Sequence, residues 1–420
     1  MSWPTYVTVN DVAAVDSGPA FKSAHFGEPG EGIRLLRGDN IEPGALRWTR
    51  TKTWPSHLID GYQHLAVEEE DIILGMDRPI ISSGLKLARV ATADIPALLV
   101  QRVARIRAMD IDSRFLYHWL SSDAFVRHLK ATATGTQLPH VTLASIKGFR
   151  VPRFDDVTER RIVEILEDHL SRLDAAADYI RAAERRLDTF LTATLMNLIP
   201  DVDDYPAKWE RSCVGDAGVV ELGRQRHPDW HSGPNMKPYL RVANVFEDRI
   251  DTRDVMEMHW PAETFDRFKL RVGDVLLNEG QTPDLLGRPA LYRGEPAEVA
   301  FTNSLLRFVA SDRVLPEFAL LVFRRHMRAG RFKRESRITT NIAHLSASRL
   351  KPIEFPIPDL AEQAAIVASA QRSFEAVERQ RVQLAIAKSR REQLRKAILS
   401  AAFSGRLTGS STELRELETV

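Results

Sequence analysis

The chain of 420 residues contains a single cysteine, Cys213, so it can form neither an internal disulfide nor a cysteine-based metal cluster. A lone thiol of this kind is expected to be a small core residue. No apolar run approaches the roughly 20 residues that span a bilayer. The first residues also lack the basic start and apolar stretch of a secretory signal. We therefore expect a cytoplasmic protein without membrane contact.

The chain also lacks an excess of either charge, because 58 basic and 57 acidic residues leave a net charge of +1. Any contact with nucleic acid must therefore come from local clusters. The sequence has no Pro-Pro pair, as the aromatic motif of amino-methyltransferases requires, and no Gly-Lys pair, as a phosphate-binding loop requires. The 12 histidines give no pair that we interpret as metal ligands. We expect no catalytic residue, no metal and no cofactor bound by this chain.

The sequence does contain an internal repeat, at a shift of about 204 residues. Residues 36–41 (LRGDNI) correspond to residues 240–245 (LRVANV), and residues 71–74 (DIIL) correspond to residues 274–277 (DVLL). The stretch around Arg105 matches that around Arg307. Four further residues of the first copy, His140, Lys147, Pro152 and Asp155, recur as His344, Lys351, Pro356 and Asp359. A constant shift over so long a stretch indicates a duplication.

Each copy divides into two parts by the period of its apolar residues. Residues 1–155 and 201–358 contain short apolar runs broken by Gly, Pro and Asp, which favour strands and turns mixed with a few helices. Residues 156–200 and 359–405 predict two long helices, and residues 406–420 predict a flexible tail. The predicted fold is α+β, with two mixed α/β domains joined by two long coiled-coil helices.

The long helices carry a 3.5-residue apolar seam, which is typical of coiled coils. In the first helix the predicted seam consists of Ile162, Leu166, Leu173, Ile180, Leu187 and Phe190. In the second helix it consists of Ile366, Val377, Leu384, Leu394 and Ile398. Stripes of this length, about 60 Å in a helix of about 40 residues, must be covered. We expect the two helices to pair antiparallel, with the two globular domains at opposite ends and a pseudo-twofold axis between them.

Two segments resemble a known family. Residues 136–140 (TQLPH) lead to Val151-Pro152, and residues 340–342 (TNI) lead to residues 355–363 (FPIPDLAEQ). A G-T-Q-like turn followed by P-x-P-x-L-x-E-Q at the start of a long helix is similar to the specificity subunit of Type I restriction-modification systems. Trp209 followed by residues 213–216 (CVGD) resembles the domain-opening pattern of that family. The first copy departs from the pattern, with Arg153-Phe154 and Glu159-Arg160 in place of the Pro-rich step and Glu-Gln.

The resemblance implies a DNA-reading subunit that is not itself an enzyme. Residues 1–155 and 201–358 would each be a target-recognition domain for one half of a bipartite site in double-stranded DNA. The helices would set the spacing of the half-sites and dock two adenine methyltransferase subunits, which would bind S-adenosylmethionine and flip the target base. Motor-nuclease subunits that use ATP and Mg would cleave unmodified DNA.

One basic cluster is the main candidate for DNA contact. It consists of Arg324, Arg325, Arg328, Arg331, Lys333, Arg334 and Arg337, with Glu335 as its only acid. Such arginines neutralise phosphates or pair with guanine. The alternative is a helix face whose arginines meet acids elsewhere in the fold. Weaker candidates are Arg47, Arg50 and Lys52, near Trp48 and Trp54, and the loop residues Gln281 and Thr282.

Three other functions stay open at this point. The first is the specificity subunit of a modification-only complex, which has no nuclease. The second is a coiled-coil scaffold that binds only proteins, and the third is a stand-alone enzyme. The target DNA sequence and its spacer length cannot be read from one sequence, because specificity depends on pose and DNA shape as well as side-chain type.

Overall fold

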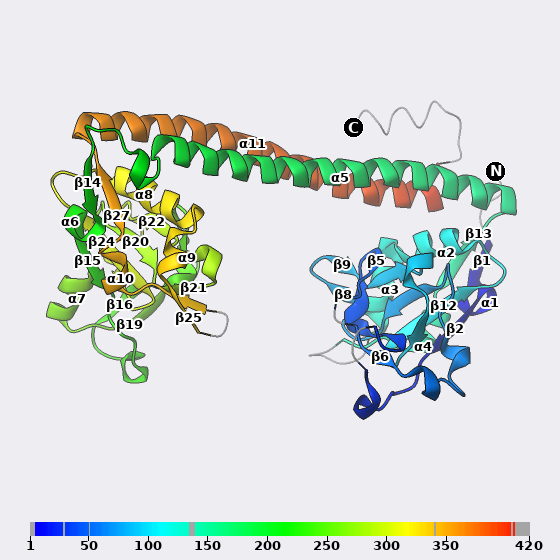
Figure 1. Ribbon diagram of the computed structural model, residues 1–420. Coiled ribbons are helices and arrows are strands. Elements are labelled where there is room, and N and C mark those ends of the chain that lie inside the picture. Colours follow the sequence, from blue (N-terminus) through cyan, green and yellow to red (C-terminus); the bar gives the residue numbers. More distant parts are fainter. Residues whose placement is uncertain are drawn as a thin grey trace. The chain divides into compact units, whose positions relative to one another are not determined.

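The structure is a computed structural model that describes residues 5–27, 30–49, 51–133, 139–339, 342–404 and 406–407, without the side chains of residues 337–339. The chain divides into two compact units. The first unit comprises residues 1–179 and 386–420, and the second comprises residues 180–385. Each unit contains one globule and half of each of two long helices, α5 (Asp156–Leu198) and α11 (Leu360–Phe403) (Figure 1).

The globule of the first unit is built on an antiparallel four-stranded sheet, in the order β10-β7-β12-β2. Its strands are β2 (Ala13–Ser17), β7 (Ile72–Gly75), β10 (Leu87–Arg89) and β12 (Val103–Ala108). A second sheet holds β3 (Ile33–Leu36), β6 (Thr53–Trp54) and β11 (Ala97–Leu99). Smaller pairs are β1 (Thr5–Thr8) with β13 (Arg150–Arg153), β4 (Ile41–Glu42) with β5 (Ala45–Leu46), and β8 (Ile80–Ile81) with β9 (Gly84–Leu85). The helices are α1 (Val9–Val12), α2 (Ser113–Leu120), α3 (Asp123–Thr132) and α4 (Leu143–Lys147).

The globule of the second unit repeats this topology, with a four-stranded sheet in the order β15-β24-β20-β22. Its strands are β15 (Gly218–Leu222), β20 (Val275–Asn278), β22 (Pro289–Leu291) and β24 (Leu305–Ala310). The second sheet holds β16 (Met236–Leu240), β19 (Met256–His259) and β23 (Ala300–Phe301). Smaller groups are β14 (Glu210–Cys213) with β27 (Glu354–Ile357), β17 (Val245–Phe246) with β18 (Arg249–Ile250), and β21 (Gly280–Gln281), β25 (Arg337–Thr339) and β26 (Ile342–His344). The helices are α6 (Val214–Ala217), α7 (Ala262–Phe268), α8 (Pro316–Arg328), α9 (Arg331–Glu335) and α10 (Ala347–Leu350).

The two globules also share individual contacts, which confirms the predicted duplication. In the first, Arg105 of β12 donates from Nε to Oδ1 of Asp16 on β2 at 3.0 Å. In the second, Arg307 of β24 donates from Nη2 to Oε2 of Glu221 on β15 at 2.6 Å. Each arginine also donates to a backbone carbonyl, of Ala66 in the first globule and of Lys269 in the second. A pair between an arginine and a carboxylate therefore joins the same two strands in both copies.

The contacts at the start of each long helix account for the residues by which the first copy of the repeat differs from the second. Asp155 and Asp359 cap the helices, because Asp155 accepts hydrogen bonds from two backbone N–H groups of the first turn and Asp359 accepts one. Next, Gln363 lies fully buried and donates to the carbonyl of Pro358. The corresponding residue Glu159 is also buried, which raises the pKa of its carboxyl group, and Arg153 pairs with it at 2.9 Å. The two departures thus compensate each other, since Arg153 supplies the charge that Glu159 requires.

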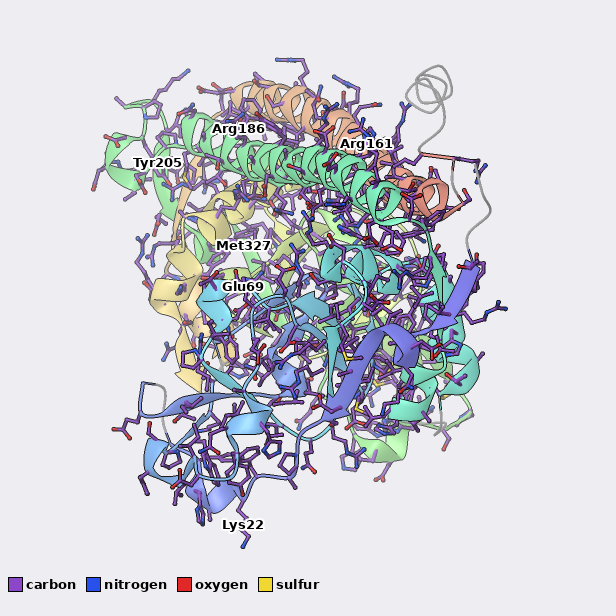
Figure 2. The ribbon with its side chains drawn as sticks, turned by 90° about the vertical axis from the view of Figure 1, so that its right-hand side faces the viewer. Lys22, Glu69, Arg161, Arg186, Tyr205 and Met327 are labelled. Atoms are coloured by element: carbon purple, nitrogen blue, oxygen red, sulfur yellow. The ribbon has the colours of Figure 1, made fainter. Side chains whose placement is uncertain are left out.

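Segments of α5 and α11 pack antiparallel in each unit. In the first unit, Asp174 of α5 pairs with Arg395 of α11 at 3.3 Å. Two heptads later in α5, in the second unit, Asp188 lies 4.0 Å from Arg381, which is two heptads earlier in α11. The predicted antiparallel helices are therefore confirmed within each unit. Exposed residues such as Arg161 and Arg186 lie on the outer side of α5 (Figure 2).

The predicted seam is buried at Ile162, Leu166, Ile366, Val377 and Ile398. It is half-buried at Leu173, Ile180, Leu187, Leu384 and Leu394. The prediction is wrong at Phe190, whose side chain is 50% exposed, whereas the next residue, Leu191, is buried. A 3.5-residue frame drifts by about 20° per heptad from the period of a straight helix, which amounts to about 80° between Ile162 and Phe190. The helix therefore turns Leu191 and Leu195 inward instead.

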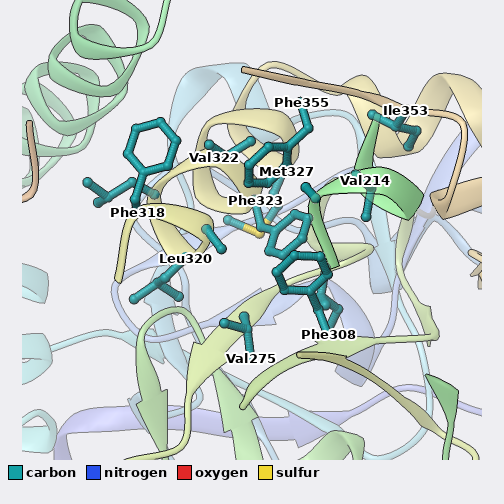
Figure 3. Close-up of a cluster of buried hydrophobic side chains, with 14 of the residues drawn as sticks. Val214, Val275, Phe308, Phe318, Leu320, Val322, Phe323, Met327, Ile353 and Phe355 are labelled. Atoms are coloured by element: carbon teal, nitrogen blue, oxygen red, sulfur yellow. The ribbon is translucent and has the colours of Figure 1, made fainter. Parts of the chain in front are cut away.

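Each globule shares a core with its helix segments. In the first unit, Ile162 and Leu166 of α5 pack with Ile398 and Phe403 of α11 around α2. The Phe403 ring lies 5.3 Å from Phe115 and 4.8 Å from Trp119, measured between ring centroids. In the second unit, Leu195 of α5 and Ile366 of α11 join a cluster around α8. Figure 3 shows the α8 side chains of that cluster, packed with residues of β20, β24 and β27.

Three expectations meet the structure in different ways. The expectation of a core position for Cys213 is wrong, because the residue is half-buried in β14 and its thiol donates to Oδ2 of Asp216 at 3.1 Å. The predicted domain limits stay predictions, and the compact units follow another division, since each contains half of both helices. In the predicted tail, residues 408–420 lie outside the described residues, whereas Leu407 is buried. Among the described helices, none is both long and apolar enough to cross a membrane.

Replacing Phe403 with alanine should destabilise the first unit by about 3–5 kcal/mol, because it removes a buried ring from a shared core. The matched control is Phe190→Ala, which removes the same ring from an exposed position of α5 and should cost under about 1 kcal/mol. Urea denaturation of both variants measures the two losses. Equal losses would contradict a core that includes the end of α11.

His118 of α2 should make the first unit sensitive to acid. Burial lowers the pKa of His118 to about 4, and Arg89, Arg395 and Arg114 act in the same direction. The folded unit holds this imidazole neutral, whereas the unfolded chain binds a proton below pH about 6.5. The free energy of unfolding therefore falls as the pH drops from about 6.5 to about 4.

In His118→Leu this fall should be smaller by about 3 kcal/mol, as measured by urea denaturation at a series of pH values. His57→Leu, at an exposed position of the same unit, is the control and should retain the wild-type pH dependence. A His118→Leu profile that parallels the wild-type profile would show that the imidazole is not held neutral by the fold.

Candidate nucleic-acid interface

The predicted basic cluster lies on α8, on α9 and on the residues that follow α9. Helix α8 is buried along most of its length, because its apolar residues contribute to the core of the second unit. Its arginines are buried as well, with side-chain exposures of 7% for Arg324, 3% for Arg325 and 12% for Arg328. Buried guanidinium groups need acidic partners.

Glu247, in the turn between β17 and β18, is the central acid of these pairs. Arg328 binds it with two hydrogen bonds, from Nε to Oε1 at 2.8 Å and from Nη2 to Oε2 at 2.7 Å. Arg324 donates from Nε to the same Oε1 at 2.9 Å and from Nη1 to Asp248 at 3.4 Å. Burial alone would raise the pKa of Glu247, but the hydrogen bond from Arg328 and the charges of both arginines bring it below its ordinary value.

The same arginines reach the long helices within the second unit. Arg328 donates from Nη1 to Asp188 at 2.9 Å and to Thr192 at 3.0 Å, and both acceptors belong to α5. The Arg324 guanidinium lies 4.1 Å from the ring centroid of Phe374 on α11. This Glu247 network therefore fixes the globule of the second unit on its helix segments.

The other two inner arginines are paired in the same way. Arg325 donates from Nε to the backbone carbonyl of Ile199 at 3.2 Å and pairs with Asp201. Arg331 donates from Nε to both carboxylate oxygens of Glu354, each at 2.9 Å, and pairs with Glu335. These side chains stabilise the unit and already have acidic partners within it.

Arg324, Arg325, Arg328 and Arg331 therefore match the alternative of arginines that meet acids elsewhere in the fold, and DNA contact by them stays a prediction. Residues distant in the sequence supply the compensating acids. The prediction stays untested for Lys333 and Arg334, which are exposed, although Lys333 pairs with Asp284 at 2.9 Å. Arg337 begins β25, and its side chain is not among those described.

Of the weaker candidates in the first unit, the structure describes Arg47 and Lys52. Arg47 is exposed and pairs with Glu42 at 3.0 Å. Lys52 is half-buried next to β6, and its backbone carbonyl accepts a hydrogen bond from Leu35. Arg50 lies outside the described residues. DNA contact by these three residues therefore stays a prediction.

In the second unit, Gln281 ends β21 and is half-buried, and its Oε1 accepts a hydrogen bond from the N–H of Thr282 at 3.0 Å. Thr282 is exposed. The related turn residues Thr136, Gln137, Thr340 and Asn341 lie outside the described residues. In the part of the chain that is described, no group of three acidic, histidine or cysteine side chains has a metal-binding arrangement.

Two arginines that the sequence did not single out are held over tryptophan rings. Arg34 of β3 lies 4.4 Å from the ring centroid of Trp48 and borders a shallow hollow that Gly32 and Pro96 also line. Arg224 lies 3.7 Å from the ring centroid of Trp230. The sequence gives no signal for the Arg224 contact, because one of its two ring partners, Trp260, is distant in the sequence.

Residues 3–180 match the family model described as the Type I restriction modification DNA specificity domain. Over 171 residues the chain is 30% identical to the Type I restriction enzyme EcoAI specificity subunit of Escherichia coli, a match that covers 40% of this chain and 28% of that relative. The EcoBI specificity subunit of Escherichia coli is 23% identical over 96% of this chain and 86% of its own length.

The fold is also similar to that of a solved structure, titled as the structural basis of complex assembly and conformational transition of the type I R-M system. The TM-score is 0.73 at 17% sequence identity, over 97% of this chain and all of the other. At that identity the likeness bears on the fold alone.

The Glu247 network yields a stability prediction. Glu247→Gln removes the charge that two buried arginines share, so it should lower the free energy of unfolding by about 3 kcal/mol. The same substitution at Glu42, whose pair with Arg47 is exposed, should cost under about 1 kcal/mol. Urea denaturation measures both variants. A loss at Glu247 no greater than that at Glu42 would contradict the role assigned to the network.

Proposed function

We propose that the chain is the DNA sequence-specificity subunit of a Type I restriction-modification complex, because residues 3–180 match the family model described as the Type I restriction modification DNA specificity domain. Each globule would be a target-recognition domain for one half of a bipartite site in double-stranded DNA. The observation that carries the proposal is the duplication, since two copies of one fold suit a site with two separate halves.

The proposed partners on the helices are two adenine methyltransferase subunits. Both units leave apolar side chains of the helices in solvent, as expected of a docking surface. In the first unit these are Tyr179 and Ile386, which are 79% and 56% exposed. In the second unit they are Phe190 and Val382, which are 50% and 48% exposed. S-adenosylmethionine would bind to these partners, and their chemistry would act on a flipped adenine.

Motor-nuclease subunits, which would use ATP and Mg, complete the proposed complex. The chain itself would have no catalytic role and would select the DNA on which its partners act. A modification-only complex differs from this proposal only in lacking the nuclease. Purifying the complex and assaying ATP-dependent cleavage of unmodified DNA would distinguish the two.

Methylome sequencing tests the proposed function directly. Cells that express the chain with its methyltransferase partner should methylate adenine in one bipartite motif, and deletion of this chain alone should abolish that methylation. An unchanged methylome would favour the alternative of a scaffold that binds only proteins. Methyl transfer by the isolated chain would instead favour the third alternative, a stand-alone enzyme.

A further inference from the structure

A long exposed loop joins β15 to β16 in the second unit. All but a few of its residues, 223–235, are exposed, and the exceptions include Gly223 and Arg224 at the start of the loop and Trp230 at its centre. Between Gly223 and Lys237 the only acid is Asp229, which lies 3.2 Å from His227. The basic residues of this stretch therefore outnumber its acids, and among them Lys237 lies 4.0 Å from Glu298.

Arg224 is held rigidly at the base of this loop. Its guanidinium lies between two tryptophan rings, 3.7 Å from the ring centroid of Trp230 and 4.8 Å from that of Trp260. Nη1 donates to the backbone carbonyl of His259 at 2.9 Å. The residue is 9% exposed. The planar guanidinium group is thus oriented before any ligand binds, which reduces the conformational entropy lost on binding.

Arg224 differs from the other deeply buried arginines in its partners. Arg105, Arg324 and Arg325 each pair with a carboxylate. In the described part of the chain, the side-chain hydrogen bond to His259 is the one that Arg224 makes, and no acid pairs with it. Burial without a counter-charge lowers its pKa below the ordinary value. A buried cation that lacks an anion is costly, and a bound anion would remove that cost.

The first unit suggests that packing of the loop does not require an arginine. Gly18 and Gly223 are equivalent, because a Cβ at either position would lie within 2.5 Å of a backbone carbonyl oxygen, of Leu99 or of Thr302. The loop after Gly18 packs Phe21 against Trp54, with the ring centroids 4.8 Å apart. Lys22 then projects outward at the edge of the globule (Figure 2). An apolar side chain therefore suffices to hold the loop on the sheet.

We propose that Arg224 binds a phosphate group of the DNA backbone and so positions the second recognition domain on its half-site. The inference rests on the proposed function and adds to it a contact residue and a ligand group. A guanidinium fork matches phosphate oxygens, and backbone contacts of this kind fix the register of a protein on DNA without reading its sequence. Arg226 and Lys237 would add to the positive potential around the contact.

The test uses the full chain in complex with its methyltransferase partners, and two duplexes. One duplex carries the motif that the wild-type complex methylates, and the other has the same bases in scrambled order. Binding is measured from 50 to 200 mM salt. Arg224→Gln should weaken binding to both duplexes roughly tenfold, and the slope of log K against log salt should become shallower by about 0.9, the value for one phosphate.

Two further variants separate this contact from a structural role. Arg224→Lys retains the charge without the fork and should restore most of the salt slope, which a purely structural role would not predict. Arg253→Gln is the matched control, because Arg253 of the same globule is exposed and pairs with Asp251, and it should leave the slope unchanged. Thermal unfolding of each complex verifies that the variants are folded.

Three outcomes would overturn the inference. The first is a folded Arg224→Gln complex with wild-type affinity and slope. The second is a change in the methylated motif without a change in slope, because it would assign Arg224 to base reading. The third is a wild-type complex that binds neither duplex, which would also reject the proposed function. In the first two outcomes the proposed function survives, so the two failures are distinguishable.

Discussion

The need to cover the apolar faces of two long helices governs the rest of this structure. Neither α5 nor α11 forms a separate rod, because each helix contributes side chains to the core of a globule. In the first unit that core contains Ile162 from one helix and Phe403 from the other. In the second unit it contains Leu195 and Ile366. In each unit the globule and its helix segments therefore share one hydrophobic core.

The burial of the α8 arginines in the second unit is a consequence of this packing. Because α8 packs between the sheet and the helices, its polar residues are buried together with its apolar ones. Arg324 and Arg328 then require Glu247 and Asp188, which lie far away in the sequence. A buried arginine that loses its acid costs free energy. The network therefore favours the one orientation of the globule on its helix segments in which every pair forms. Charge density along the sequence was a poor guide to the surface for this reason.

The sequence alone predicts the duplication, the two helices, their antiparallel packing within each unit and the mixed sheets, because periodic apolar residues and punctuating glycines are local signals. The exact helix face is predicted less well, since the 3.5-residue frame fails by Phe190. The candidate site is predicted least well. Arg325 binds the carbonyl of Ile199 and the carboxylate of Asp201, which lie over a hundred residues away in the sequence. One of the two tryptophan rings that contact Arg224 also belongs to a distant residue, Trp260. Pairings of this range leave no pattern in a sequence read one window at a time.

The position of Phe403 has a consequence for synthesis on the ribosome. Residues 386–407 complete the hydrophobic core of the first unit, yet they are translated after the whole of the second unit. The nascent first globule therefore stays incompletely packed until residues 386–407 have been synthesised. A product terminated before α11 would retain an unfinished core with exposed apolar surface, which marks a polypeptide for proteolysis. The fold thus couples the packing of the first unit to the synthesis of α11.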